Sequence, residues 1–236
     1  RRSCVKIMLK RVLDLLIALP AAVLTAPIVL VLTAAIWAYD RGNPLYIPRR
    51  IGKGRKPIAV FKLRTMVVDA DKTGVDSTAR GDSRLLPGAE TLRRFKLDEL
   101  PQFWNVIAGN MSLVGPRPNV IREVEKYSQE ELRLLTVKPG LTDLSSIVFS
   151  DLADRVAGSD DVNRSYETNV RPWKSRLGLF YVDSQSLSMD LAILVGTAVS
   201  LVNRQLSLKI VRHILISHAA PQSLIEHASG QTKVGK

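Results

Sequence analysis

The longest apolar stretch of the chain runs from Val12 to Tyr39 and contains one charged residue, Asp14. About 20 apolar residues suffice for a helix to cross the hydrocarbon core of a bilayer, so this stretch predicts a membrane helix. Pro20 and Pro27 lie inside it. Because a proline lacks a backbone N–H and its ring clashes with the preceding turn, we expect the helix to break at Ala26 and Pro27.

Basic residues flank the apolar stretch on both sides, and such flanks favour the cytoplasmic side of a membrane. The flanking cations are Arg1, Arg2, Lys6, Lys10 and Arg11 before it, and Arg41, Arg49, Arg50, Lys53, Arg55 and Lys56 after it. A re-entrant hairpin, broken at Pro27, enters and leaves by the same face and keeps both flanks in the cytoplasm. A kinked single span is the alternative, and a buried core helix is disfavoured by the length of the stretch.

The remaining pattern predicts short elements of both kinds, and therefore an α+β fold associated with the membrane. Alternation over 58–66 predicts a strand with Lys62 and Arg64 on one face. Helical spacing of apolar residues predicts a helix over 91–108, which either packs in a core or meets a membrane interface. A mixed-charge helix is expected over 119–135.

The C-terminal third is apolar again. Residues 187–202 predict a helix that lies on the membrane or packs under the domain, and the chain from Gln205 suits an interfacial helix. We expect residues 228–236 to be disordered and the polar stretch 69–90 to form a mobile loop or short helices.

The charge balance indicates an anionic partner. The 236 residues carry a formal net charge of +12, which suits nucleic acid, an anionic membrane surface or phosphorylated substrates. We expect no specific nucleic-acid binding, because the cations cluster beside apolar segments and no aromatic-basic binding motif is present. The single cysteine, Cys4, excludes an internal disulfide and a cysteine-based zinc site.

One adjacent pair of acids, Asp98 and Glu99, lies within this basic chain. Arg93, Arg94 and Lys96 precede the pair, and Gly115-Pro116-Arg117-Pro118 follows it. Acids among cations suggest phosphate and metal chemistry, since a carboxylate can attack phosphorus or hold Mg²⁺ while arginines neutralise phosphate oxygens. On its own, the pair could equally be helix N-terminal acids that complement the macrodipole.

Several short motifs, taken in order, resemble one family. They are Lys10-Arg11 with Asp14 and Pro27, then Phe61–Met66, Asp82–Arg84, Leu92–Arg94, Leu97–Gln102, Met111–Pro118, Lys138–Thr142 and Tyr181–Asp183. From about Lys10 to about Val202, the chain resembles the bacterial sugar transferases, the monotopic polyprenyl-phosphate phosphoglycosyl transferases. Any one motif is a weak signal, but the ordered set is specific.

The resemblance implies transfer of a phospho-sugar from a UDP-sugar to polyprenyl (undecaprenyl) phosphate, with release of UMP. It makes Asp98 the nucleophile of a covalent phosphoaspartyl-sugar intermediate and gives Asp98 and Glu99 a role in holding Mg²⁺. The substrate-binding residues that it implies are Lys62, Arg64, Arg93, Arg117, Pro118 and Lys138.

The resemblance also implies an organisation and a location. Residues 1–40 would form the re-entrant membrane helix, 41–204 a catalytic domain at the cytoplasmic face of the bacterial inner membrane, and 205–236 an interfacial helix and tail. The partners would be a UDP-sugar, polyprenyl phosphate and the lipid bilayer, and a homodimer is compatible with the family.

The chain departs from the family pattern in two places that bear on structure. Ala26 stands where a serine often precedes the helix-breaking proline, and Asp143 stands where glycine is common after Lys138–Thr142. A reading of a different class is a non-catalytic, membrane-anchored basic scaffold that binds anionic lipid. It predicts that Asp98 and Glu99 are dispensable and that Mg²⁺ has no effect.

Overall fold

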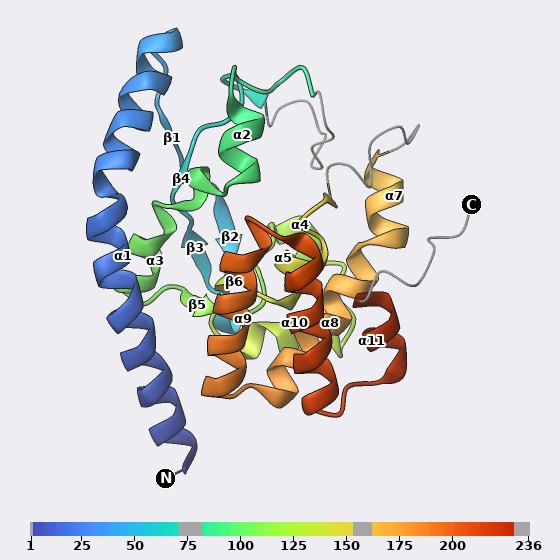
Figure 1. Cartoon of the computed structure of the whole chain (residues 1–236). Helices are drawn as coiled ribbons and strands as arrows, with labels where there is room; N and C mark the ends of the chain where they lie inside the picture. The colour runs from blue at the N-terminus through green and yellow to red at the C-terminus, as the bar shows by residue number, and fades with distance from the viewer. Residues whose placement is uncertain (1, 71–81, 153–161, 229–236) are drawn as a thin grey trace.

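A computed structural model describes residues 2–70, 82–152 and 162–228. A long helix, α1 (Arg2–Asp40), runs along one side of the molecule, and the remaining elements pack beside it (Figure 1). The strands and the 3-10 helices between them are β1 (Leu45–Tyr46), β2 (Arg49–Ile51), η1 (Lys53–Arg55), β3 (Pro57–Ala59), β4 (Lys62–Leu63), η3 (Leu97–Glu99), β5 (Ser112–Val114), η4 (Glu131–Thr136) and β6 (Gly140–Thr142). The shorter helices are α2 (Ala89–Arg94), α3 (Gln102–Ala108), α4 (Ile121–Val124), α5 (Leu144–Val148), α7 (Val162–Asn169), α8 (Arg171–Ser184), α9 (Leu187–Ser200), α10 (Arg204–Ser217) and α11 (Gln222–Ala228).

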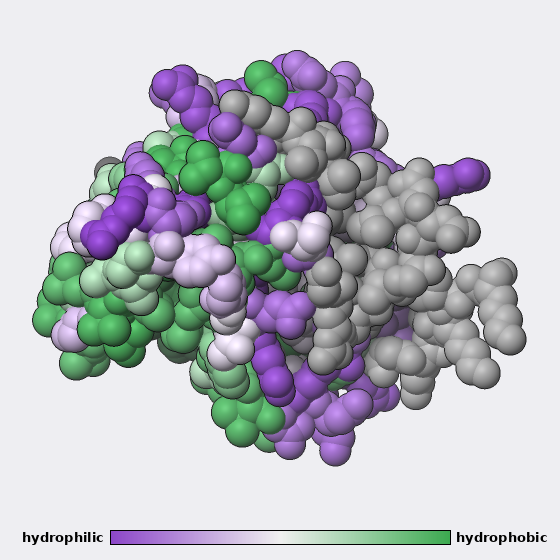
Figure 2. Space-filling model, turned by 90° about the horizontal axis from the view of Figure 1, so that it is seen from above, coloured by the Kyte–Doolittle hydropathy of each residue, from purple (hydrophilic) through white to green (hydrophobic). Residues whose placement is uncertain are grey.

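Helix α1 has one face against the domain and one exposed face. Asp14, Ala18 and Ala22, spaced four residues apart, are buried against α3 and β5, and Ile36 is buried further along. Large apolar residues on the outer face are exposed, among them Leu16, Val23, Leu24, Leu30 and Val31. Hydrophobic residues accordingly gather on the α1 side of the molecule in Figure 2. By length and composition, α1 is able to cross a membrane.

The predicted break at Ala26 and Pro27 is wrong. Both Pro20 and Pro27 lie inside one continuous helix, which bows around the domain without reversing its direction (Figure 1). Each proline removes a single helical hydrogen bond, and a helix tolerates this when packing on its neighbours holds it on both sides of the site. Such anchors exist here at Asp14 and at Asp40.

The predicted strand over 58–66 is divided between two small sheets. β3 pairs with β2 and β4 pairs with β1, both antiparallel, while β5 and β6 form a parallel pair. The division occurs at Val60 and Phe61, because the Asn105 side chain accepts a hydrogen bond from Phe61 N (2.9 Å) and donates one to Ala59 O (2.6 Å). The buried amide of Asn105 therefore replaces a neighbouring strand at this point.

The single helix predicted over 91–108 is also wrong, because the chain forms α2, η3 and α3 in succession. Lys96 adopts φ 55°, a left-handed conformation that ends the first helix. Pro101, whose missing N–H suits a helix start, immediately precedes α3. The helix predicted over 119–135 is reduced to α4 and the 3-10 helix η4.

The main hydrophobic core lies among α5, α8, α9 and α10. Fully buried residues from each of these elements fill it, including Ile147, Leu177, Ile193 and Val211. Helix α9 confirms the helix predicted near 187–202, and α10 buries its apolar face against α9 and α5. Residues 204–228 thus share one core with the predicted catalytic segment, and the tail predicted to be disordered lies almost entirely outside the described residues.

Candidate active site

The acid pair lies in the tight connection between α2 and α3. The left-handed turn at Lys96 leads into the 3-10 helix η3, which presents Asp98 and Glu99 from one short segment. Asp98 is 6% exposed, whereas most aspartates lie in water. The local backbone therefore places a carboxylate inside the protein, which is costly unless charges nearby or a ligand compensate for it.

Glu99 is held by two cations. Lys62 Nζ donates to Glu99 Oε1 (2.8 Å), Arg117 Nη1 donates to Oε2 (3.0 Å), and Arg117 Nη2 also contacts Oε1. The fork of Arg117 matches both oxygens of the carboxylate, which is the strongest form of a carboxylate–guanidinium pair. Glu99 thus joins β4 and the loop after β5 at one point.

A close approach of two backbone segments positions Arg117. A Cβ on Gly140 would lie 2.1 Å from Gly115 N, and a Cβ on Gly115 would lie 2.5 Å from Lys138 O, so both positions require glycine. The parallel register of β5 with β6 produces this contact, and Arg117 Nη1 also donates to Leu141 O on β6. Pro116 and Pro118 flank Arg117 and restrict its backbone.

The two acids have opposite electrostatic environments. Burial raises the pKa of Asp98 above its usual range, and the charge of Lys62 opposes that shift. Burial also disfavours ionised Glu99, but Arg117 and Lys62 outweigh it and hold the pKa of Glu99 well below its usual range. Glu99 is therefore the fixed anion of the site, and Asp98 is the more basic carboxylate.

A further arginine completes the surroundings of Asp98. The charges of Arg93 and Arg117 act on Asp98 in the same direction as that of Lys62. Among the described residues, Arg93 Nη1 and Gln102 Nε2 are buried donors with no hydrogen-bond partner. Buried donors beside an acid pair are suited to donate hydrogen bonds to the oxygens of an anionic ligand.

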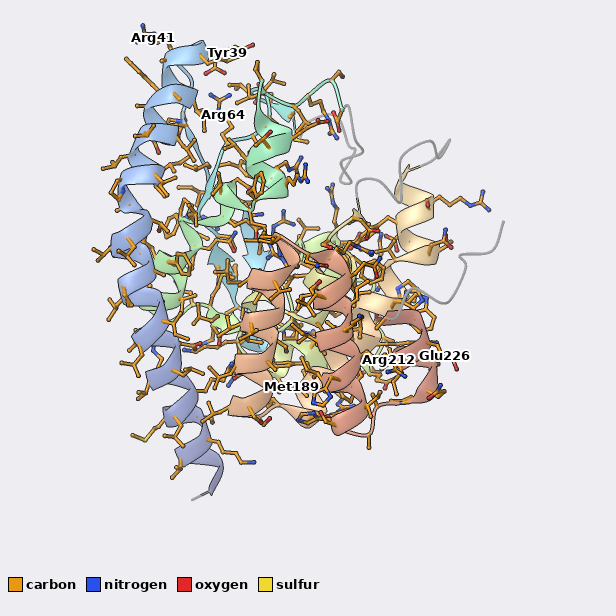
Figure 3. All side chains as sticks on the ribbon, viewed as in Figure 1. Tyr39, Arg41, Arg64, Met189, Arg212 and Glu226 are labelled. Carbon is orange, nitrogen blue, oxygen red and sulfur yellow. The ribbon has the colours of Figure 1, made fainter. Side chains whose placement is uncertain are left out.

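Two of the predicted substrate-binding residues lie elsewhere. Arg64 donates to Asp40 through both Nη1 (2.7 Å) and Nη2 (2.6 Å), and its Nε donates to Asn43 O. Figure 3 shows Arg64 near the C-terminal end of α1, close to Tyr39 and Arg41. Lys138 lies beside Gly109, and its electrostatic neighbours are Arg11, Asp14 and Lys53. Alternation along a strand predicts the face of Arg64, but not that Asp40 binds it.

Helix α1 contributes polar contacts to the elements that carry the site. Asp14 Oδ1 accepts from Leu113 N and Ser112 Oγ, both at 3.0 Å, on the strand that leads to Arg117. Arg11 donates to Val106 O (2.6 Å) and Ile107 O (2.7 Å) at the C-terminal end of α3, where a cation complements the helix dipole. The membrane-type helix and the acid pair therefore belong to one connected framework.

Comparison with known proteins identifies the family of the chain. The family model described as "Bacterial sugar transferase" matches residues 5–204. The chain belongs to the bacterial sugar transferase family. Its members are membrane-associated proteins of bacteria.

Three relatives illustrate the similarity. A UDP-N-acetylgalactosamine-undecaprenyl-phosphate N-acetylgalactosaminephosphotransferase of Aeromonas hydrophila is 29% identical over 80% of this chain and 42% of the relative. A UDP-glucose:undecaprenyl-phosphate glucose-1-phosphate transferase of Klebsiella pneumoniae is 32% identical over 82% and 40%, respectively. The exopolysaccharide production protein PSS of Rhizobium leguminosarum bv. phaseoli is 33% identical over 84% of this chain and 97% of the relative. The chain thus spans less than half of the first two relatives and nearly all of the third.

Lys96 and Asp143, to which the sequence assigned no role in the site, also act electrostatically on it. Burial lowers the pKa of Lys96, whose neighbours include Arg117 and Glu99. Asp143, the departure from the family pattern, is buried as the N-cap of α5, accepts from Ser146 N (2.7 Å), and its charge acts on both Lys96 and Arg117. Asn105, which bonds the backbone between β3 and β4, could have been found from the sequence as a polar residue inside an apolar stripe. No feature of the sequence marks the left-handed turn at Lys96.

Proposed function

We propose that the protein transfers a sugar 1-phosphate from a UDP-sugar to polyprenyl phosphate and releases UMP. The observation that carries the proposal is the buried Asp98 carboxylate, surrounded by the cations of Lys62, Arg93 and Arg117. The relatives from Aeromonas and Klebsiella support the reaction class through their names. Family membership further supports a location at the bacterial inner membrane, and the proposal places the site at its cytoplasmic face, where a UDP-sugar is available.

In the first step, an Asp98 oxygen attacks the sugar-bound phosphorus of the UDP-sugar. A bond forms between Asp98 and phosphorus, the bond from phosphorus to the bridging oxygen breaks, and UMP leaves with that electron pair. A carboxylate with a raised pKa is a better nucleophile than an ordinary one, and the nearby cations offset the repulsion between Asp98 and the diphosphate.

In the second step, an oxygen of the polyprenyl phosphate attacks the same phosphorus. The bond to Asp98 breaks, the carboxylate is regenerated, and the product is a polyprenyl-diphosphate sugar. Glu99 touches neither bond; its contacts keep Arg117 and Lys62 pointed at the phosphate position. Glu99 in this proposal is a positioning residue as much as a metal ligand.

The donor set fits Mg²⁺ only together with a substrate. Among the described residues, no group of three or more His, Cys, Asp or Glu side chains is arranged to hold a metal ion. Mg²⁺ is commonly bound by one or two carboxylates with phosphate oxygens completing its coordination, and Asp98 with the Oε2 side of Glu99 would supply those carboxylates. When bound, the ion would neutralise charge on the diphosphate.

The test is UMP release from a panel of UDP-sugars with undecaprenyl phosphate and Mg²⁺, measured in detergent or lipid nanodiscs. The proposal expects release with at least one sugar and loss of release in Asp98→Asn. A basic scaffold that binds anionic lipid would bind vesicles equally well with and without that substitution and would release no UMP from any donor. That result would replace the enzymatic proposal with the scaffold.

A further inference from the structure

Gln102, the first residue of α3, buries an amide nitrogen that makes no hydrogen bond to the described residues. Its side chain is one of the largest fully buried ones, and 1% of the residue is exposed. Its Nε2 donor is shielded from solvent and has no partner. Most buried polar groups are hydrogen-bonded, because an unpaired one costs the free energy of removing it from water. The unpaired donor of Gln102 therefore points to a role in binding.

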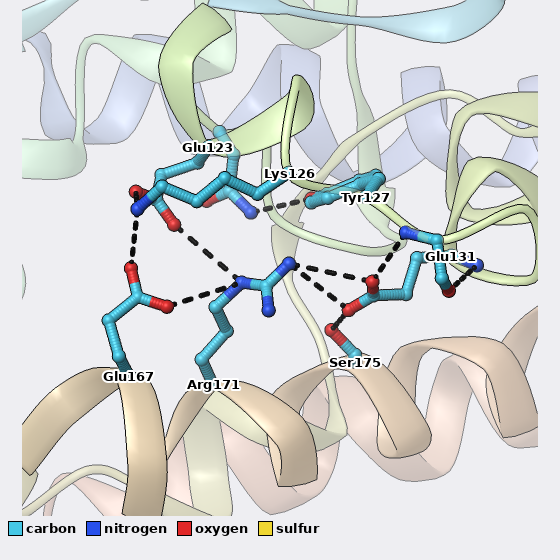
Figure 4. Close-up of polar contacts among 9 residues, drawn as sticks. Glu123, Lys126, Tyr127, Glu131, Glu167, Arg171 and Ser175 are labelled. Atoms are coloured by element: carbon cyan, nitrogen blue, oxygen red, sulfur yellow. Dashed lines mark hydrogen bonds and ion pairs between the residues drawn. The ribbon is translucent and has the colours of Figure 1, made fainter.

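The polar contacts of α8 show how this fold pairs such groups when they hold elements together. Figure 4 shows the Arg171 side chain directed at three carboxylates, those of Glu123, Glu131 and Glu167. Ser175 Oγ donates to Glu131 in the same network, at 2.6 Å. A side chain with a structural task is bonded there to the element that it holds.

The segment from Ala59 to Lys62 lies along the helical stretch that contains Gln102. Lys62 Nζ donates to Glu99 (2.8 Å), and the fully buried amide of Asn105 donates to Ala59 O (2.6 Å). Gln102 falls between these two contacts, yet its Nε2 bonds neither the strand nor the helix. Asn105 thus performs the structural task of a buried amide at this place, and Gln102 does not.

Gln102 and Asp98 share one face of this stretch. Bonds from Leu100 N to Leu97 O (3.4 Å) and from Phe103 N to Leu100 O (3.2 Å) keep the backbone helical between them. With three to four residues per turn, side chains four positions apart are neighbours, and both residues are buried. The Asp98 carboxylate accepts no hydrogen bond from Gln102 or from any other described residue.

The nucleophile of the proposed reaction therefore has an unbonded donor one turn away. A phosphoryl group at Asp98 carries non-bridging oxygens, which are strong acceptors. Arg93, five residues before Asp98 on α2, also has a buried donor without a partner, Nη1. One charged donor and one neutral donor thus flank the acid, from the segment before it and the segment after it.

We infer that Gln102 is a further catalytic residue, whose Nε2 donates to a non-bridging oxygen of the phosphoryl group at Asp98. The inference rests on the proposed function for its substrate. Each of the two steps makes or breaks the bond between Asp98 and the same phosphorus, so one donor serves both. The amide forms no covalent bond and keeps its protons, and it stabilises the charge on the phosphoryl oxygen.

Gln102→Met tests this inference, because methionine has a similar length and no hydrogen-bond donor. With the active UDP-sugar, formation of the adduct at Asp98 and its discharge by polyprenyl phosphate should each slow about 100-fold. Calorimetric binding of inorganic phosphate to the full chain in detergent should weaken roughly ten-fold. Gln102→Glu keeps the shape but replaces the donor with an acceptor, and it should bind phosphate no better than Gln102→Met.

The matched control is Gln185→Met, at an exposed glutamine that follows α8. It should leave the rates and the phosphate affinity within about two-fold of wild type. Equal losses in Gln185→Met and Gln102→Met would contradict a specific role for Gln102.

Thermal unfolding separates binding from folding. Because the Gln102 donor has no partner, Gln102→Met should unfold at or above the wild-type midpoint, whereas Asn105→Leu leaves Ala59 O without its donor and should unfold below it. A lowered midpoint in Gln102→Met, or an unchanged phosphate affinity, would overturn the inference. Slow adduct formation with unchanged phosphate affinity would mean that Gln102 acts on Asp98 alone.

Failure of the proposed function would give a different result. A wild-type protein that forms no adduct and releases no UMP from any UDP-sugar would refute the reaction. Phosphate affinity that still depends on Gln102 would then retain its role as a phosphate donor, because calorimetry needs no turnover.

Discussion

Glu99→Gln tests whether Glu99 organises the site through its two cations. The carboxylate receives two contacts from Arg117 and one from Lys62. The amide keeps one acceptor, carries no charge, and turns a donor towards one of the cations. Removing one partner of a buried pair costs about 3–5 kcal/mol. Because Glu99 is 14% exposed and Arg117 is 29% exposed, solvent weakens the pair and we expect a cost just below that range, about 2–3 kcal/mol.

The magnitude is large enough to measure. In a chain of this size, about 1 kcal/mol shifts the unfolding midpoint by roughly 2–4 °C, so Glu99→Gln should unfold about 5–10 °C below wild type in nanodiscs at pH 7. Glu125→Gln, at an exposed glutamate at the end of α4, is the matched control and should unfold within about 1 °C of wild type. Equal midpoints for the two variants would refute the role given to Glu99.

The difference in unfolding midpoint between wild type and Glu99→Gln should also depend on pH. The folded-state pKa of Glu99 is lowered, so its contribution to stability is complete above its unfolded pKa of about 4.3 and is lost as pH falls through the lower folded value. The difference in midpoint between wild type and Glu99→Gln should be constant from about pH 6 to pH 8 and should shrink below about pH 4. A difference that grows on acidification would contradict the assigned contacts.

Two further substitutions test the framework. Asp14→Ala leaves Leu113 N without its acceptor and should lower the unfolding midpoint by about 4–10 °C in the same assay. Asp14→Asn keeps an acceptor and should lower the midpoint less. Equal decreases in the two variants would refute a hydrogen-bonding role for Asp14. Gly140→Ala would place a Cβ 2.1 Å from Gly115 N, a clash that the packed backbone of β5 and β6 cannot relieve. The variant should therefore misfold and lose the monodisperse peak in size-exclusion chromatography. A normal peak would show that β5 and β6 separate more easily than their packing indicates.

The sequence predicted where helices lie better than it predicted where each helix is interrupted or continues. Apolar spacing predicts where helices lie, and α9 follows that prediction closely. It does not predict that a left-handed turn at Lys96 and the 3-10 helix η3 interrupt the helix expected over 91–108. For α1 the sequence predicted a break where the structure has one continuous helix. The rule about proline considers only local hydrogen bonds, whereas tertiary contacts at Asp14 and Asp40 hold the helix on both sides of the prolines.

The candidate site was predicted in part. The acid pair, Lys62, Arg93 and Arg117 come together as expected. Arg64 does not join them, because its carboxylate partner comes from the end of α1 and only the tertiary structure brings the two together.

The covalent role of Asp98 is the central claim, and intact-protein mass spectrometry tests it most directly. Wild type would be incubated with the active UDP-sugar and Mg²⁺, without polyprenyl phosphate, and quenched. The account predicts a mass increase equal to one sugar phosphate, mapped to the peptide that contains Asp98, absent from Asp98→Asn and discharged by added acceptor. An adduct that persists in Asp98→Asn, or full UMP release by that variant, would contradict it.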